Sequence, residues 1–448
     1  MRNFLSATPK AALVHPHDMK YHREREEMNA VSHVEGTENF PNLALLTIAS
    51  LFGPEWELSY IDEDYLTQNG LTYSYLGENF DLVCLTAMNH QSYQAYRIAD
   101  FFRKRGIYTV MGGMHASALP EEALMHVDSV IVGEGEDAFP RFLEDFMKGT
   151  PQKVYYSSGK VDLTQVPPPR FDILPNPGWF DKYPLFATRG CPRNCEFCCL
   201  GEVYGPIYRK KSPQQVADEI RMIQSIVKDP FISFADENML ADRTWSKELA
   251  KALKPLNIKW EAYCDISAAR DEEMLELLRE SGCVELIIGF ETISKENMQT
   301  VDNWKASQIA GYPEAIKTIQ SHDIGILACF VVGFDHDNEE TFDNLISFLE
   351  ENPVFELDIA VLTPMPGTRL HSRLKKENRL YPEKWDDYTW YHINFEPAGL
   401  KPDQIKKGIM RVFDSYSSPM MEEKRRKMFA SIEARLPDEN GRNIARCN

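Results

Sequence analysis

The stretch Arg189-Gly190-Cys191-Pro192-Arg193-Asn194-Cys195-Glu196-Phe197-Cys198-Cys199 decides how the rest of the chain is interpreted. Cys191, Cys195 and Cys198 stand four and then three residues apart on a loop that contains Gly and Pro, directly after a short apolar run at 184–187. Soft thiolates packed this closely favour zinc or an iron–sulfur cluster. Three thiolates on one loop can hold three irons of a [4Fe-4S] cube and leave the fourth iron open for a substrate or cofactor.

Zinc is the main alternative for this loop. A structural zinc site usually closes with four ligands, and no second Cys or His pair follows at finger spacing. A loop of unligated cysteines is disfavoured, because free Cys prefers apolar interiors. Cys199 adjoins Cys198 and cannot easily reach the same cube, so we interpret it as a neighbour of the ligands.

Length and composition describe a globular protein of two or three domains. The chain has 448 residues, of which 43% are hydrophobic and 26% charged, a balance typical of folded proteins. No run of about 18 apolar residues predicts a membrane span. Nine cysteines without an export signal at 1–6 indicate a reducing, cytoplasmic location. The formal charge of −19 argues against a large nucleic-acid interface.

Residues 1–150 alternate between strand-like and helix-like segments, which predicts a doubly wound, Rossmann-like parallel sheet. The expected strands lie at 11–14, 56–61, 81–86, 108–111 and 129–132. Such sheets bind ligands at the carboxyl ends of their strands, where this chain has glycines at 112–113 and 133–135. Residues 151–182 are rich in proline and are expected to form a linker between domains.

Residues 183–375 predict a partial parallel barrel of six βα units, with its chemistry at the carboxyl ends of the strands. The expected strands lie at 184–187, 231–235, 258–264, 284–290, 326–334 and 357–362. Residues 376–448 are expected to be mostly helical, with one long helix at 402–434. The aromatic residues at 385–395 predict a small core under the barrel mouth or, alternatively, a wall of the substrate pocket.

The cysteine loop resembles the CxxxCxxC signature of the radical S-adenosylmethionine (SAM) superfamily, including the aromatic Phe197 before the last cysteine. Residues 288–291 are similar to the family's "GxE" segment, and residues 364–368 to its "P-x-PGT" segment. The resemblance covers roughly residues 183–370. It implies that Cys191, Cys195 and Cys198 bind a [4Fe-4S] cluster, and that SAM is held by Asp236, Glu237, Glu291 and Gly333.

The N-terminal part resembles the cobalamin-binding domain that precedes the barrel in one large class of these enzymes. Residues 112–116, 120–122 and 133–136 stand where that class has "GGxHAT…PEE…GEGE". The Asp-x-His-x-x-Gly motif of many cobalamin proteins is absent, since residues 18–22 have the wrong spacing, which implies cobalt without that histidine ligand. The implied cobalamin contacts are Gly112, Gly113, His115, Gly133, Glu134 and Gly135.

The resemblance implies an enzyme that cleaves SAM reductively to a 5′-deoxyadenosyl radical and, with cobalamin, methylates an unactivated carbon of a small-molecule substrate. An electron donor such as a flavodoxin or ferredoxin is the implied protein partner. No residue is singled out as catalytic.

Three alternatives stay open at this point. The same cofactors can serve a rearrangement, cyclisation or oxidation. A tRNA methylthiotransferase needs a second cluster on three N-terminal cysteines, whereas residues 1–150 contain only Cys84. A non-enzymatic iron–sulfur sensor does not require the polar groups that follow several barrel strands.

Overall fold

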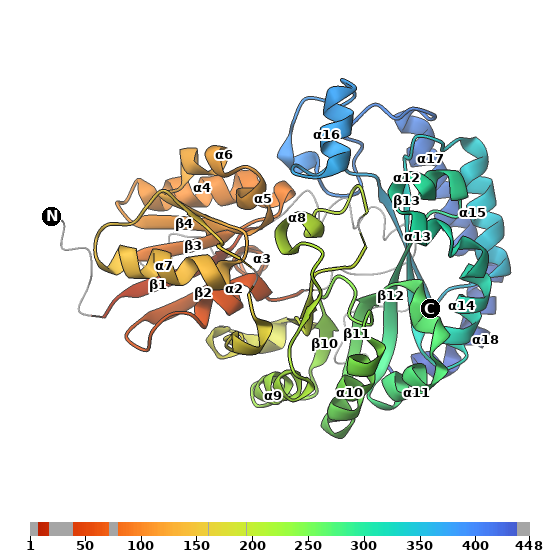
Figure 1. Cartoon of the computed structure of the whole chain (residues 1–448), viewed down its shortest axis with the longest axis horizontal. Helices are drawn as coiled ribbons and strands as arrows, with labels where there is room; N and C mark the ends of the chain where they lie inside the picture. Colours follow the sequence, from red (N-terminus) through yellow and green to blue (C-terminus); the bar gives the residue numbers. More distant parts are fainter. Residues whose placement is uncertain (1–7, 18–38, 71–78, 160, 194, 437–448) are drawn as a thin grey trace.

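The computed structural model describes residues 8–17, 39–70, 79–159, 161–193 and 195–436. Two six-stranded sheets, each with all its strands parallel, form two α/β domains that lie side by side (Figure 1). Residues 18–22, considered above as a cobalamin motif, lie outside the described residues. Among the helices that are described, none has the length and apolarity needed to cross a bilayer.

The first sheet has the strand order β2-β1-β3-β4-β5-β6, which confirms the doubly wound fold. Its strands are β1 (Lys10–His15), β2 (Glu57–Asp62), β3 (Leu82–Thr86), β4 (Tyr108–Gly112), β5 (Ser129–Val132) and β6 (Val154–Tyr156). All five residues of β3 are buried, as expected for a strand covered on both faces. The order reverses between β1 and β3, and doubly wound sheets bind their ligands at such a switch point.

Helices cover both faces of this sheet. They are α2 (Leu43–Ala49), α3 (Glu63–Gln68), α4 (Ser92–Arg103), α5 (Gly113–Ala118), α6 (Pro120–His126) and α7 (Gly135–Met147). Leu13 and Cys84 pack in the core that contains α2 and α7, whereas Val83 and Leu85 pack in the core that contains α4. Successive strand residues therefore point to opposite helical layers, as the period of two requires.

Strand β6 differs from the sequence-based prediction. It pairs with β5 through Val130 and Val154, although residues 151–182 were expected to form a linker. The strand has only three residues, of which Tyr155 is buried and Tyr156 is exposed. Such a short segment has too little hydrophobic periodicity to be distinguished from a loop.

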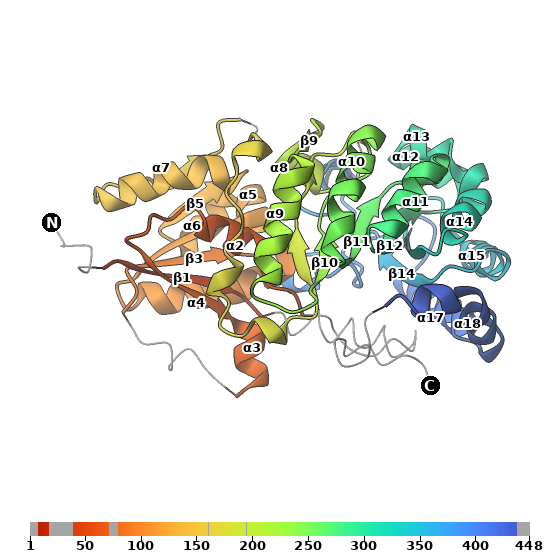
Figure 2. The same cartoon turned by 90° about the horizontal axis from the view of Figure 1, so that it is seen from below.

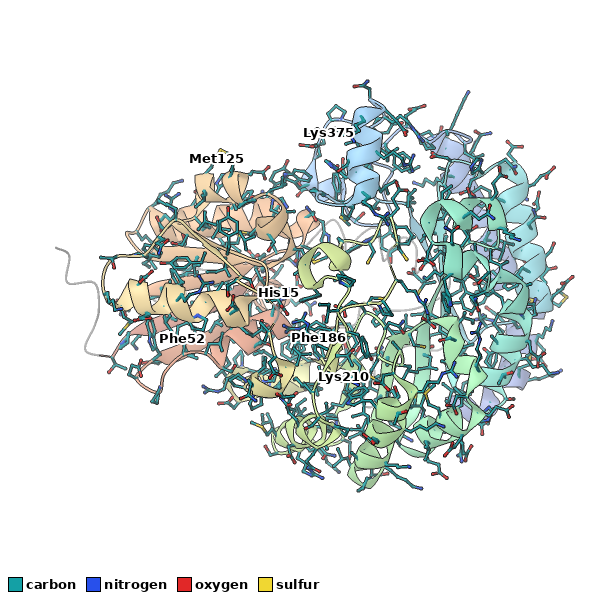
Figure 3. All side chains as sticks on the ribbon, in the orientation of Figure 1. His15, Phe52, Met125, Phe186, Lys210 and Lys375 are labelled. Atoms are coloured by element: carbon teal, nitrogen blue, oxygen red, sulfur yellow. The ribbon has the colours of Figure 1, made fainter. Side chains whose placement is uncertain are left out.

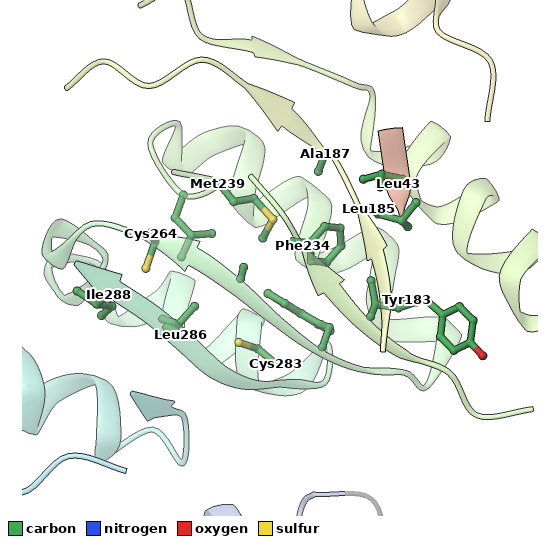
Figure 4. Close-up of a cluster of buried hydrophobic side chains, with 14 of the residues drawn as sticks. Leu43, Tyr183, Leu185, Ala187, Phe234, Met239, Cys264, Cys283, Leu286 and Ile288 are labelled. Carbon is green, nitrogen blue, oxygen red and sulfur yellow. The ribbon is translucent and has the colours of Figure 1, made fainter. Parts of the chain in front are cut away.

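The second sheet has the order β14-β13-β12-β11-β10-β7 and forms the predicted partial barrel. Its strands are β7 (Tyr183–Leu185), β10 (Phe231–Phe234), β11 (Lys259–Cys264), β12 (Cys283–Glu291), β13 (Gly325–Val332) and β14 (Glu356–Val361). Figure 4 shows the core on β7, β10, β11 and β12, with Leu43 of α2 beside Leu185. One hydrophobic core therefore runs from the first sheet into the barrel.

Helices line the outside of the barrel (Figure 2). They are α9 (Pro213–Gln224), α10 (Arg243–Leu253), α11 (Glu272–Glu280), α12 (Lys295–Val301), α13 (Asn303–Ala306), α14 (Tyr312–Gln320) and α15 (Glu339–Glu351). Helix α9 begins with Pro213 at its first position, and the Ser212 side chain accepts from the Gln215 backbone N–H. The Gln215 side chain donates to the carbonyls of Leu163 and Val166, and these bonds hold the proline-rich segment against the barrel.

The C-terminal region is helical, but the predicted single helix at 402–434 is wrong. The structure has α17 (Pro402–Tyr416) and α18 (Pro419–Glu433). Ser418 caps α18 by accepting from the Met421 N–H, and Pro419 follows at the first helical position. Proline cannot continue a preceding helix, because it lacks the N–H donor and clashes with the previous turn.

The aromatic segment forms two packed groups instead of one small core. Trp385 and Tyr388 are buried with Met365 and contact Tyr93 from the first domain. Phe395 packs in a separate group that also contains Phe197 of the cysteine loop. The segment therefore connects the barrel to the first domain.

Candidate active site

The cysteine loop follows β8 (Thr188–Arg189), which pairs with β9 (Arg209–Lys210), and runs into α8 (Leu200–Tyr204). Gly190 opens the loop at φ +86°, and a Cβ there would lie 2.3 Å from the carbonyl oxygen of Ile207. Only glycine fits this turn. The Cys198 N–H donates to the Cys195 carbonyl at 3.2 Å, so these two cysteines share one turn.

The donor set fits a soft metal cluster. Cys191, Cys195 and Cys198 are half-buried, and burial raises the pKa of each thiol, that of Cys195 to about 12. The negative charge of the Cys198 thiolate also raises the pKa of Cys191 and of Cys195. A bound cation offsets such a penalty, since metal ligation requires deprotonated thiolates.

Cys199 lies in a different environment. Burial raises its pKa to about 12, and it packs against the group of Met365, Trp385 and Tyr388. Cys195 packs instead against the separate group that contains Phe395. The different surroundings of the two residues support the interpretation of Cys199 as a residue outside the ligand set.

The two carboxylates after β10 have different partners. Asp236 accepts from the backbone N–H of Ala187 at 3.2 Å and from the N–H and hydroxyl of Thr188, and burial raises its pKa to about 7. It therefore fastens the segment before the cysteine loop. Glu237 accepts from the Gly190 N–H at 2.9 Å through Oε2, whereas its buried Oε1 has no hydrogen-bond partner among the described residues. Burial raises the pKa of Glu237.

Glu291 ends β12 at a bulge and has a left-handed backbone with φ +59°. Its carboxylate contacts Lys305 Nζ at 2.5 Å, and the same ammonium donates to the Gly289 carbonyl at 3.2 Å. Burial lowers the pKa of Lys305, but the charges of Glu291 and Cys195 raise it well above its usual value. The lysine was not foreseen from the sequence, because nothing local connects it to the strand end.

Gly333 follows β13 with φ +102°, a conformation that side chains rarely adopt. Its N–H donates to Asp337 Oδ2 at 2.7 Å. Burial raises the pKa of Asp337 to about 6, although hydrogen bonds from the Gly333 and Phe334 N–H groups act in the opposite direction. The Asp337 carboxylate therefore holds the turn after β13 by accepting from its backbone N–H groups.

Arg193 is a second residue that sequence reasoning missed. It lies between the first two cysteines, with its guanidinium 3.2 Å from the ring centroid of Trp304. It also donates to Asp265 Oδ2 at 2.9 and 3.1 Å. Burial raises the pKa of Asp265, but Ser267 and Arg193 reverse this and leave it lowered. These contacts hold the cysteine loop to the ends of the barrel strands.

On the first domain, the predicted glycines bring two strand ends together. Gly113 starts α5 with φ +88°, and a Cβ there would lie 2.3 Å from Thr86 Oγ1. The ends of β3 and β4 therefore meet with no side chain on Gly112 or Gly113. Gly133 at the end of β5 also has a positive φ, +85°. The two positive-φ glycines therefore let the strand ends at this edge pack closely against Thr86 and Ser157.

His115 does not lie on that edge. It is fully buried, 3.0 Å from Asn89 Nδ2 and 2.7 Å from the Tyr96 hydroxyl. Its Nε2 is also 3.3 Å from Glu122 Oε1, which accepts from Trp385 Nε1 at 2.9 Å. The histidine therefore holds helices together and connects them to the aromatic segment.

Glu134 joins the two domains. Its carboxylate accepts from Arg189 Nη1 at 3.2 Å and from Arg209 Nη1 at 2.8 and 2.9 Å. Gly135 beside it packs tightly, because a Cβ there would lie 2.6 Å from Ile48 Cδ1. Figure 3 shows Phe186, two residues before β8, in this region between the domains. The "GEGE" segment thus contacts the barrel directly.

Comparisons with known proteins agree with this architecture. The radical SAM superfamily model matches residues 185–349, and the B12 binding domain model matches residues 35–143. The chain is 30% identical over 380 residues to bacteriochlorophyllide d C-12(1)-methyltransferase of Chlorobaculum tepidum, covering 83% of this chain and 81% of the relative. It is 27% identical to hopanoid C-2 methylase of Rhodopseudomonas palustris, covering 76% and 65%.

Two solved structures share the fold. The cobalamin-dependent SAM radical enzyme OxsB matches with a TM-score of 0.71 at 16% identity, covering 95% of this chain and 71% of that one. The radical SAM methyltransferase TsrM of Kitasatospora setae matches with 0.66 at 14% identity, covering 96% and 89%. The two matched domains bring a [4Fe-4S] cluster, SAM and cobalamin as cofactors. The chain belongs to the cobalamin-dependent radical SAM enzymes, a family that includes these methyltransferases.

Proposed function

We propose that this enzyme transfers a methyl group to an unactivated carbon of a large apolar metabolite, of the tetrapyrrole or polycyclic lipid class. The proposal rests on the contact between Arg189 and Glu134. Arg189 comes directly before the cysteine loop, and Glu134 is the second residue after β5. This contact joins the start of the cysteine loop to the carboxyl edge of the first sheet, which supports a shared site between the two domains. The relatives named for methylation of a bacteriochlorophyllide and of a hopanoid support the substrate class.

In this proposal Cys191, Cys195 and Cys198 hold the cluster, and Glu237 receives the ammonium group of SAM at its unpartnered Oε1. The bound cofactors supply a one-electron cleavage of SAM and a transferable methyl group; the protein supplies position and exclusion of water. A carboxylate with a pKa raised by burial gains from a cation at that oxygen. Asp236 acts as a positioning residue, since the Ala187–Thr188 backbone uses both its oxygens.

The first domain supports cobalamin binding through its backbone. Gly112, Gly113 and Gly133 present strand ends without side chains, and the switch point beside β3 is where this sheet type binds ligands. We assign His115 a positioning role, because it is fully buried in hydrogen bonds to α4 and α6. Glu134 is assigned to the contact between domains.

The test is turnover of anaerobically reconstituted enzyme with SAM whose methyl group carries deuterium. Substrates are a bacteriochlorophyllide and a hopanoid, with a short polar peptide as the control. We expect labelled methyl in one of the first two products, together with 5′-deoxyadenosine and S-adenosylhomocysteine. Labelled methyl in the peptide alone would contradict the proposed substrate class.

Radical ring closure is the second candidate. The chain is 26% identical over 373 residues to the anaerobic magnesium-protoporphyrin IX monomethyl ester cyclase of Rubrivivax gelatinosus, covering 75% of this chain and 65% of the relative. In the same assay, cyclisation gives a product with no added carbon and releases no S-adenosylhomocysteine. The product mass therefore separates the two candidates.

A further inference from the structure

Helix α16 (Arg369–Lys376) packs directly against the cysteine loop. Its Leu370 N–H donates to the Glu196 carbonyl at 3.1 Å, and Arg373 Nε donates to Glu196 Oε1 at 2.8 Å. Leu370 and Leu374 lie in the hydrophobic group against which Cys195 packs. One face of this helix therefore contacts the residues that hold the proposed cluster.

The opposite face of α16 is exposed and basic. Lys375 and Lys376 are exposed, as are Arg369 and Ser372. Figure 1 shows α16 at the edge of the molecule, and Figure 3 shows Lys375 at the outside of that helix. A shallow hollow of about 370 Å³ is lined by Gly367, Arg369, Ser372, Arg373, Lys376 and Glu377.

This basic face contrasts with the charge of the whole chain. The formal charge is −19, yet α16 itself carries two arginines and two lysines and no acidic residue. Glu377, which follows the helix, contacts Arg379 at 2.8 Å, and Glu196 and Asp335 contact Arg373. Among the residues that the structure describes, Lys375 and Lys376 take part in no ion pair, whereas Arg373 takes part in three. Their positive charge is therefore available to a negatively charged partner.

We infer that the exposed face of α16 is the docking surface for an acidic one-electron carrier protein of the flavodoxin or ferredoxin class. The inference rests on the proposed function, which requires one electron at the cluster for each SAM cleaved. The carrier loses one electron, the cluster gains it, and no proton or bond is transferred in this step. A helix with its side chains is about 10 Å thick, so a carrier on this face lies one helix away from Cys195.

The test is charge reversal of the two lysines, K375E/K376E, with K375Q/K376Q as a milder variant. The matched control is K406E/K407E on α17, where two adjacent lysines are also exposed. The reconstituted holoenzymes are titrated with a purified flavodoxin and, separately, a ferredoxin to obtain dissociation constants at low and high salt. Cluster reduction by each reduced carrier and by dithionite is followed by stopped-flow absorbance.

We expect K375E/K376E to weaken carrier binding and to slow carrier-driven reduction by about tenfold or more at low salt, because electrostatic steering changes association rates by 10 to 10³. The difference should shrink at high salt, where exposed charges are screened. The neutral variant should show a smaller effect, and the α17 control and all dithionite rates should match the wild type.

Unchanged carrier binding in K375E/K376E would overturn the inference, and so would an equal loss in the α17 control. A fall in the dithionite rate would also contradict it, because the lysines would then act on the cluster itself. The wild-type protein with dithionite separates the two proposals. Absence of SAM cleavage there refutes the proposed function, whereas the carrier titrations alone decide the docking surface.

Discussion

The substitution Glu134→Gln distinguishes a contact between domains from a cobalamin ligand. The Glu134 side chain is 3% exposed, and its partners Arg189 and Arg209 are 7% and 11% exposed. The carboxylate also accepts from the Val161 N–H at 3.1 Å. Glutamine removes the charge and turns an amide N–H₂ toward a guanidinium or a backbone N–H, so at least one of these donors loses its acceptor.

Breaking one side of a buried ion pair costs about 3–5 kcal/mol. Because glutamine keeps one acceptor oxygen, we expect the free energy of unfolding to fall by the low end of this range, about 3 kcal/mol. With a urea dependence of about 3 kcal/mol per M, the midpoint of unfolding should fall by about 1 M. Urea unfolding followed by fluorescence measures this shift. Glu121→Gln, at an exposed position of α6, is the control and should leave the midpoint unchanged.

Cobalamin binding is measured on the same Glu134→Gln protein without urea, by equilibrium dialysis. We expect the folded variant to retain most of its corrinoid affinity, because the glycine edge of the sheet is unaltered. A variant with wild-type stability and no bound corrinoid would refute the structural role of Glu134. It would restore the role in cobalamin binding that the "GEGE" resemblance implies.

The other predictions concern the cluster, SAM and acid stability. Glu237→Gln should weaken SAM binding about 10- to 100-fold, since a hydrogen bond to a charged group contributes about 1.5–3 kcal/mol. Equilibrium dialysis measures the SAM affinity, with an unchanged cobalamin affinity as the control. An unchanged SAM affinity would contradict the prediction. Cys195→Ala should lose the cluster iron on reconstitution, whereas Cys199→Ala should retain it, and equal iron in both proteins would exclude the assigned ligand set. Burial raises the pKa of Glu136, but Arg189 reverses this and leaves it lowered. Its stabilising effect is therefore present in full above the ordinary pKa of glutamate, about 4.3, and is lost as pH falls through the lowered pKa. Acid unfolding of Glu136→Gln should be less steep than that of the wild type, and parallel curves would argue against the pairing.

Much of the fold could be predicted from periodicity, because buried parallel strands form apolar runs with polar residues at their ends. β3 and β10 are clear examples, with every residue buried. The boundary errors have local causes. β6 is too short to show a period, and the helical pattern at 402–434 continues across the serine cap and the proline at which α18 begins.

The site was less predictable, because its contacts join residues that are distant in the sequence. The cysteine spacing indicates the cluster, but it does not reveal that Arg193 stacks on Trp304 or that Lys305 contacts Glu291. A motif match also does not state which way a side chain points. His115 lies in a matching motif, yet it is fully buried among helices.

The measurement that tests the central claim most directly is the metal and corrinoid content of anaerobically reconstituted protein, read together with its absorbance spectrum. The account predicts the iron and sulfide of one [4Fe-4S] cluster and one corrinoid per chain, with the cluster bands lost in Cys191→Ala and the corrinoid bands retained. Stoichiometric zinc in the cysteine loop, with no corrinoid bound, would contradict it.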